Sequence, residues 1–284
     1  MSDATGLAVD PGLSGIGAAG AGRRRRGASL AGLRRAGGYV LLPLLLLACW
    51  QALYALGLIR PILLPPPSQV AVAFVELAGS GELLRHLGIS LLRVLEGFAL
   101  AALVGLALGV AIGLSRRLDH ATDLLVQLIK PIPPIAWIPL AILWFGIGEG
   151  GKVFIIFLGA LFPVLVNTID GIRQTDHRHV ELARILEVGR VRFITHVVLP
   201  GALPAIMTGL RVGLMVAWMC VVAAELIAAS SGVGYLIMDA RQLSQTDRVL
   251  VGMITIGAMG KLLDLVLKLV ETRLITWKPA FTGA

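Results

Sequence analysis

Apolar residues in this chain come in long runs that short polar segments separate. The runs cover residues 39–59, 88–114, 121–146, 152–171, 202–228 and 249–270. A helix needs roughly 20 apolar residues to cross the hydrocarbon core of a bilayer, and each run is long enough to do so. The pattern therefore predicts an all-α membrane protein with six transmembrane helices.

Basic residues are distributed unevenly between the two sides of the predicted membrane. The polar segments predicted to lie on the same side of the membrane as the amino terminus contain Arg116, Arg117, Arg173, Arg178, Arg184, Arg190, Arg192, Arg273 and Lys278. The opposite segments contain Arg60, Arg85, Lys152, Arg241 and Arg248. Cytoplasmic loops are enriched in Lys and Arg, so we expect both termini to lie in the cytoplasm.

The composition argues against several other classes of protein. The chain is 57% hydrophobic and 15% charged, which is too little charge to cover the surface of a soluble domain. The chain has a net charge of +8, and its basic residues gather between the apolar runs. This placement favours contact with membrane lipid over binding of nucleic acid. The five His and two Cys form no metal-ligand cluster. Cys49 and Cys220 lie within apolar runs, which favours buried core residues over a disulfide.

The pattern divides the chain into four parts. Residues 1–37 are rich in Gly, Ala and Ser around the run Arg23–Arg26, which predicts a disordered, basic cytoplasmic tail. Residues 38–85 contain the first membrane helix and an outer loop. Residues 86–272 form the membrane core, with a cytoplasmic helical segment over 176–198, and residues 273–284 form a cytoplasmic tail.

A glycine-rich stretch at residues 146–152 has the spacing of a phosphate-binding loop. That loop requires Ser or Thr after its lysine to hold Mg²⁺, and Val153 stands there. The stretch also joins two membrane spans on the outer side. We therefore interpret it as a tight turn between helices and expect no nucleotide site in this chain.

The longest cytoplasmic loop covers residues 172–200. Asp176 can cap a helix that runs to about Glu187. We expect a turn at Gly189 and then a second short helix that ends at Pro200. The two helices would form a protruding elbow, although the same segment is also compatible with a basic loop that only sets topology.

Within this loop, Glu181-Leu182-Ala183 followed by Leu199-Pro200 resembles the coupling motif of permease subunits in ABC importers. Leu182 replaces the first alanine of the motif, and Glu187 occupies the usual glycine position, so the turn is expected later, at Gly189. The resemblance implies contact with an ATPase subunit through Glu181, Ala183, Arg184, Glu187, Gly189, Leu199 and Pro200.

Longer stretches resemble permeases for alkanesulfonates, taurine, nitrate and related solutes: LPPPSQV (64–70), KPIPPIAWIPLAILWFGIGE (130–149), FPVLVNTIDGIR (162–173) and GKLLDLVLKLVETRLITWKPAF (260–281). The resemblance covers the chain from about residue 40 onward. It implies the type I ABC importer permease fold in a bacterial inner membrane. The implied substrate is a small anion, an alkanesulfonate or taurine, with nitrate or another small organic solute as the alternative.

The resemblance also implies the partners. These are a second copy of the chain, two cytoplasmic ATPase subunits that bind ATP and Mg²⁺, and a periplasmic substrate-binding protein. The chain itself would then be no enzyme and would hold no cofactor. An ion-coupled secondary transporter is the competing class, but it would need paired internal repeats, and the loop at 172–200 would then have no function.

Charged residues inside the membrane are functional candidates by default. Lys130, Arg211 and Glu225 are the candidates for a translocation pathway, with structural or snorkelling roles as the alternative. Arg93 and Glu96 are one helical turn apart and can pair on one face, with snorkelling side chains as the alternative. Gly105, Gly109 and Gly113 form a small-residue stripe, which favours packing inside one subunit over a dimer seam.

Overall fold

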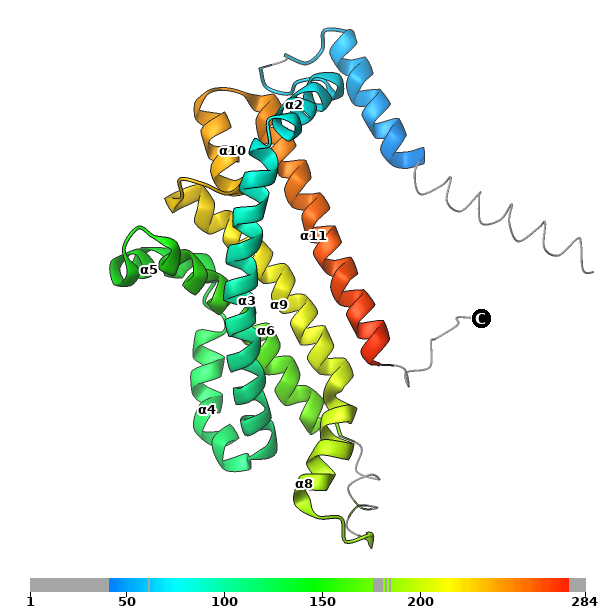
Figure 1. Ribbon diagram of the computed structural model, residues 1–284, viewed down its shortest axis with the longest axis vertical. Coiled ribbons are helices and arrows are strands. Elements are labelled where there is room, and N and C mark those ends of the chain that lie inside the picture. The colour runs from blue at the N-terminus through cyan, green and yellow to red at the C-terminus, as the bar shows by residue number, and fades with distance from the viewer. Residues whose placement is uncertain (1–40, 61, 176–180, 182, 184, 276–284) are drawn as a thin grey trace, which may run out of the picture. The chain divides into compact units, whose positions relative to one another are not determined.

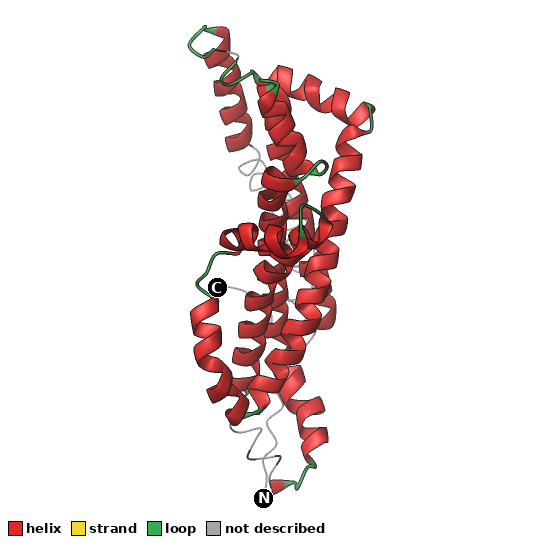
Figure 2. Cartoon of the chain, turned by 90° about the vertical axis from the view of Figure 1, so that its left-hand side faces the viewer, coloured by secondary structure: helices red, strands yellow, loops and turns green. Residues whose placement is uncertain are grey.

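The computed structural model describes residues 41–60, 62–175, 181, 183 and 185–275. The predicted tail at 1–37 and residues 276–284 of the predicted tail 273–284 therefore lie outside the described residues, as does Arg184. The described residues contain helices and no strand (Figure 2). The chain divides into two units, one of residues 1–61 with 66–68 and one of residues 62–65 with 69–284.

The first unit contains the helix Leu41–Ala55. It lies within the first predicted span but is shorter than a bilayer-crossing helix requires. Its Leu side chains are exposed, as is Cys49, so the expectation that Cys49 is buried is wrong. Gln51 accepts a hydrogen bond from the backbone N–H of Ser68 at 3.4 Å, near the start of α2 (Pro67–Gly79).

Three long helices form the core of the second unit: α3 (Glu82–Leu114), α6 (Glu149–Arg173) and α9 (Leu199–Ala228). They lie side by side (Figures 1 and 2). Glycines bring α3 and α6 close together, since a Cβ at any of four α3 glycines would lie between 2.6 and 3.0 Å from an α6 side chain. These pairs are Gly97 with Ile156, Gly105 with Val164, Gly109 with Thr168 and Gly113 with Ile172. The glycine stripe thus packs inside the subunit, as the sequence favoured.

Glycines likewise allow α6 and α9 to approach closely. The positions on α6 are Gly159, which faces Cys220, and Gly171, which faces Ala205. From α9, Gly209 faces Asn167. Cys220 is buried at this contact, so its predicted burial is confirmed. Small residues allow two backbones to approach closely, which lets van der Waals contact hold helices together in lipid.

The third predicted span is broken into two helices. α4 (Arg116–Ile129) and the stretch η1 (Pro134–Trp137) with α5 (Ile138–Phe145) meet at an angle of 85°. Pro131, Pro133 and Pro134 lie at the bend; they lack the N–H donors that would continue the helix. The break was expected, but the segment bends too sharply to form one straight span. In Figure 1, α5 lies across the long helices.

The second helix predicted in the 172–200 loop does not end at Pro200. α8 (Arg190–Phe193) and the π-helix η2 (Ile194–Val198) continue into α9, so that one helix runs over Val191–Ile227. Pro200 lies in the first turn of α9. The wider π turn before it accommodates a residue that cannot donate a backbone hydrogen bond, which corrects the predicted boundary.

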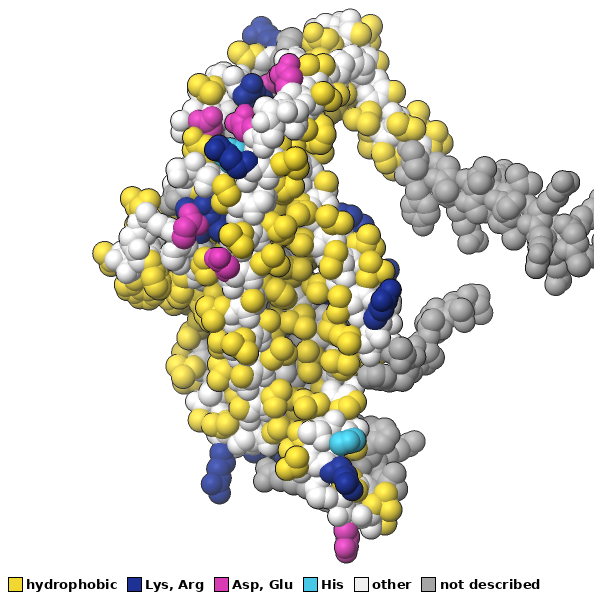
Figure 3. All heavy atoms as spheres, in the orientation of Figure 1, with side chains coloured by type: hydrophobic (Ala, Val, Ile, Leu, Met, Phe, Trp, Pro, Cys, Tyr) yellow, Lys and Arg dark blue, Asp and Glu magenta, His cyan; other side chains and the backbone are white. Residues whose placement is uncertain are grey.

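The chain ends with α10 (Val233–Gln242) and α11 (Thr246–Leu274). Trp218 on α9 donates a hydrogen bond to the carbonyl oxygen of Ile256 on α11 at 3.0 Å. Apolar side chains cover most of the face formed by α3 and α11 in Figure 3. Among the described residues, four helices are long and apolar enough to cross a membrane, or five if the bent pair is one span.

Candidate translocation site

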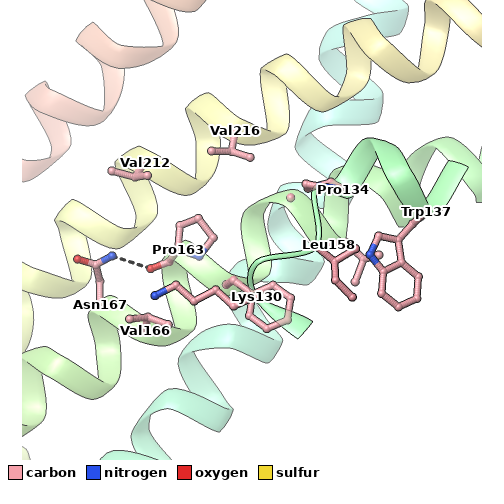
Figure 4. A pocket seen from close by; sticks show the side chains of 12 residues that line it. Lys130, Pro134, Trp137, Leu158, Pro163, Val166, Asn167, Val212 and Val216 are labelled. Carbon is pink, nitrogen blue, oxygen red and sulfur yellow. Dashed lines mark hydrogen bonds between the residues drawn. The ribbon is translucent and has the colours of Figure 1, made fainter. Parts of the chain in front are cut away.

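A pocket of about 330 Å³ lies between η1, α6 and α9. Its lining includes Lys130, Trp137, Phe162, Asn167, Val212 and Val216. Figure 4 shows Lys130 extending from the proline break toward Pro163 and Asn167. The pocket therefore joins the break in the third span to the tightly packed α6–α9 pair.

Lys130 is the cation of this pocket. It follows directly after α4, where the prolines end the helix, so the break brings its side chain to the pocket wall. None of the carboxylates among the described residues forms an ion pair with it. Asn167 donates its amide hydrogen bond to the carbonyl oxygen of Pro163 at 2.8 Å. Lys130 is exposed, so its ammonium group is accessible to an anion.

Arg211 lies beside this pocket and has partners. It forms a bidentate ion pair with Asp264 on α11, and its Nη2–Oδ2 distance is 2.9 Å. Glu271 lies 4.0 Å away. Arg211 therefore fastens α9 to α11 and lines a second hollow of about 380 Å³ between these helices.

Glu225 does not line either pocket. Its side chain is fully buried and accepts hydrogen bonds from Arg93, Ser90 and the backbone N–H of Gly234 at 2.7 to 2.9 Å. Glu225, a predicted pathway residue, thus forms a buried ion pair that joins α9 to α3.

The predicted pair of Arg93 with Glu96 is wrong. Glu96 is exposed, whereas Arg93 is buried and pairs with Glu149 and Glu225. Sequence periodicity finds neighbours on one helix, but these partners come from α6 and α9. A signal was present: a buried charge without a counter-charge is costly, so an arginine inside an apolar run needs a carboxylate from another part of the chain.

The coupling segment is described in part. Glu181 is helical and exposed, and Ala183 is helical and half-buried. Glu187 adopts a φ of 48°, and Val188 donates a backbone hydrogen bond to the carbonyl oxygen of Ala183 at 3.0 Å. Gly189 has no positive φ. The left-handed residue of the connection is therefore Glu187, at the position where the motif has glycine, and Gly189 is the last non-helical residue before α8 (Arg190–Phe193).

Comparison with known proteins defines the class. The family described as "Binding-protein-dependent transport system inner membrane component" matches residues 97–276, and the chain belongs to this family. It is a permease subunit and a multi-pass protein of the inner membrane, and ATP hydrolysis is performed by a separate subunit. Membership implies an ATPase and a substrate-binding protein as partners.

The relatives narrow the class further. The chain is 44% identical over 244 residues to the aliphatic sulfonates transport permease protein SsuC of Bacillus subtilis, covering 86% of this chain and 88% of the relative. It is 44% identical to SsuC of Escherichia coli over 84% of this chain and 91% of the relative. Identity with the taurine transport system permease protein TauC of Escherichia coli is 39%, over 82% of this chain and 86% of the relative.

A solved structure of the MetNI methionine ABC transporter in inward-facing conformations shares the fold. The TM-score is 0.52 with 16% identity, and the match covers 64% of this chain and 92% of that chain. The fold is therefore the type I ABC importer permease fold that the sequence implied.

Proposed function

We propose that this chain is the permease of an importer for alkanesulfonates. The observation that carries the substrate assignment is the pocket of about 330 Å³ with the unpaired Lys130 in an otherwise largely apolar lining. The sulfonate group would lie near Lys130, and the alkyl tail would contact Trp137, Val212 and Val216. The similarity to relatives named for aliphatic sulfonates points the same way.

The same lining distinguishes this substrate from the alternatives. None of the lining residues is acidic, so the ammonium group of taurine would find no counter-charge there. Nitrate has no tail, so it would leave the apolar side chains without a partner. Binding sites gain specificity from a few polar groups placed in an apolar lining, and this lining matches an anionic head on an apolar tail.

The proposed assembly is a homodimer with two ATPase subunits, which bind ATP and Mg²⁺, and a periplasmic substrate-binding protein. This chain would hold no cofactor. Each copy would cross the membrane six times with both termini in the cytoplasm, the helix Leu41–Ala55 being part of the first span. The basic residues of the 172–200 loop support this orientation.

Coupling to ATP would run through the segment from Glu181 to Gly189. Ile185, Leu186 and Val191 are 65 to 78% exposed at this end of the second unit, which suits docking in a groove of the ATPase. Arg184 and Glu181 would supply charged contacts. Leu199 and Pro200 are half-buried in the helix that continues to Val212 and Val216, so a rigid-body shift at the cytoplasmic end would move the pocket wall.

The test uses proteoliposomes that contain this chain, its ATPase and its binding protein. We expect ATP-dependent uptake of pentanesulfonate to exceed that of taurine and nitrate. Lys130→Met should reduce uptake about ten-fold, which corresponds to a loss of about 1.4 kcal/mol. Lys268→Met is the matched control, because Lys268 is an exposed lysine of α11 that lines neither pocket. Equal losses in both variants, or faster uptake of nitrate, would contradict the substrate assignment.

A second variant tests coupling. Glu181→Lys should abolish uptake and the stimulation of ATP hydrolysis by the loaded binding protein, because it reverses a charge on the exposed docking segment. Copurification of the ATPase with the variant would show that the complex still assembles. Normal stimulation in that complex would remove Glu181 from the coupling role.

A further inference from the structure

Arg93 is the centre of a cluster that the transport pathway does not use. All five of its N–H groups have acceptors: Glu149 accepts two at 2.5 and 2.7 Å, Glu225 accepts one at 2.7 Å, and Ser231 accepts two at 2.7 and 3.0 Å. Lys152 also donates to Glu149 at 2.9 Å. The cluster is neutral and joins α3, the start of α6, and the α9–α10 connection.

The two carboxylates of this cluster differ in their surroundings. The Glu225 side chain is 0% exposed and is held by Ser90 and the backbone of Gly234 as well as by Arg93. The Glu149 side chain is 61% exposed. If Glu149 moves away, hydration can replace part of its contacts, and Arg93 keeps Glu225 as its counter-charge. One half of the cluster is therefore permanent, and the other half can be released.

Glycines lie on both sides of Glu149. Gly146 needs glycine because its φ is +73°. A Cβ at Gly148 would meet nothing within 4 Å, and at Gly150 or Gly151 it would meet only ordinary contacts at 3.5 and 3.6 Å. Packing therefore does not require these three glycines, and their effect is to leave the backbone conformationally permissive.

The helix before this corner is only lightly packed. α5 buries Ile138 and Ala141, while Leu143 and Ile147 are 77% and 82% exposed. Its aromatic contacts go to Phe154 of the adjoining α6, with ring centroids 5.3 and 5.8 Å apart. Ile138 and Ala141 belong to the same buried apolar cluster as Val94 of α3, and the side chain of Glu149 adds an ion pair from this corner to α3.

We propose that the Arg93–Glu149 ion pair is a releasable fastener, which makes Glu149 a positioning residue for the pocket. α5 connects the corner directly to η1, whose Pro134 and Trp137 line the pocket opposite Val212 and Val216 (Figure 4). When the ion pair is formed, it holds this wall of the pocket in place. When the ion pair breaks, the glycines of residues 146–151 allow the backbone to change conformation, and the wall is displaced with it. The role of the wall in transport rests on the proposed function, whereas the fastener itself does not.

Glu96 provides a matched control. It is the same residue type on α3, one turn from Arg93, and it is exposed. It forms no ion pair with the described residues. Glu149→Gln removes the charge from the fastener, and Glu96→Gln removes a similar charge from the same region without touching it.

The first measurement is the mobility of a spin label at position 147, with the permease alone in nanodiscs. The background is Cys49→Ser with Ile147→Cys, which leaves only the buried Cys220 as a native thiol. We expect Glu149→Gln to increase the mobile fraction of the label at least two-fold, and Glu96→Gln to leave it unchanged. Equal mobility in both variants would overturn the fastener.

The second measurement uses the complete transporter. Glu149→Gln should raise ATP hydrolysis without the binding protein about five-fold and lower the uptake per ATP, whereas Glu96→Gln should change neither. A structural defect alone would lower both rates together. If Glu149→Gln does not fold, the label at 147 is followed in the otherwise unchanged protein with and without ATP and vanadate. No change in its mobility would then refute the proposal. The nanodisc result holds whichever solute is transported.

Discussion

The core of α3, α6 and α9 and the bent arm of α4, η1 and α5 are built in opposite ways. Glycines in the core bring helices together until side chains of one contact the backbone of the next. The arm has no such contacts: α4 buries none of its residues, and α5 buries two. Both regions line the same pocket. The pocket therefore has one wall made of closely packed core helices and one wall, from the arm, that buries few of its residues.

The largest effect is expected in the core. Glu225→Ala should lower the stability by about 3–5 kcal/mol, because Arg93 loses its only buried counter-charge among the described residues and the buried donors of Ser90 and Gly234 lose their acceptor. Thermal unfolding in detergent measures this as a fall in Tm. Glu225→Gln separates the effect of charge from that of shape. A change as small as that of a surface substitution would mean that the core does not depend on this ion pair.

Overpacking the core should be the next largest effect. Gly109→Val adds side-chain atoms where even a Cβ would lie 2.7 Å from Thr168. We expect a loss of about 1–3 kcal/mol, typical of extra atoms forced into a packed interior. The same thermal assay applies, and Gly257→Val on α11 is the control, since a Cβ there would meet nothing within 4 Å.

A smaller effect is expected where α9 meets α11. Asp264→Asn weakens the ion pair with Arg211, which is partly exposed. We expect a smaller fall in Tm than for either core variant, since exposed pairs contribute little. Equal falls for Asp264→Asn and Glu225→Gln would show that α11 belongs to the same rigid unit as the core.

The smallest effect is expected at the corner of the arm. Gly148→Ala should change stability by less than about 0.5 kcal/mol, because the added methyl group meets nothing within 4 Å and the backbone there is extended. Thermal unfolding should show no shift beyond error. A large loss would mean that the corner is packed against something and would weaken the comparison between the two walls.

The sequence predicted what depends on local pattern. Apolar length located the regions of the long helices, the prolines from Pro131 to Pro134 located the break, and the four-residue spacing of Gly105, Gly109 and Gly113 located a close helix contact. Each of these signals acts through the residues that carry it, so no knowledge of distant contacts was needed.

Long-range and conformational details were not predictable in this way. The partners of Arg93 are 56 and 132 residues away, so the nearby Glu96 was a misleading neighbour. Glu187 adopts the left-handed conformation although it has a Cβ, because the preceding helix ends there with a backbone hydrogen bond from Val188 to Ala183. The helix passes Pro200 because a π turn precedes it, and no sequence signal predicted that turn.

The helix Val191–Ile227 has 37 residues, which at 1.5 Å per residue is about 55 Å of continuous backbone. The hydrocarbon core of a bilayer is only about 30 Å thick, so this helix is nearly twice as long as the layer it crosses. Because of this length, the helix can act as a long lever arm. A tilt of only about 5° about one end displaces the other by about 5 Å, roughly one helical turn. Small rotations at the Val191 end are thus geometrically amplified before they reach the Ile227 end.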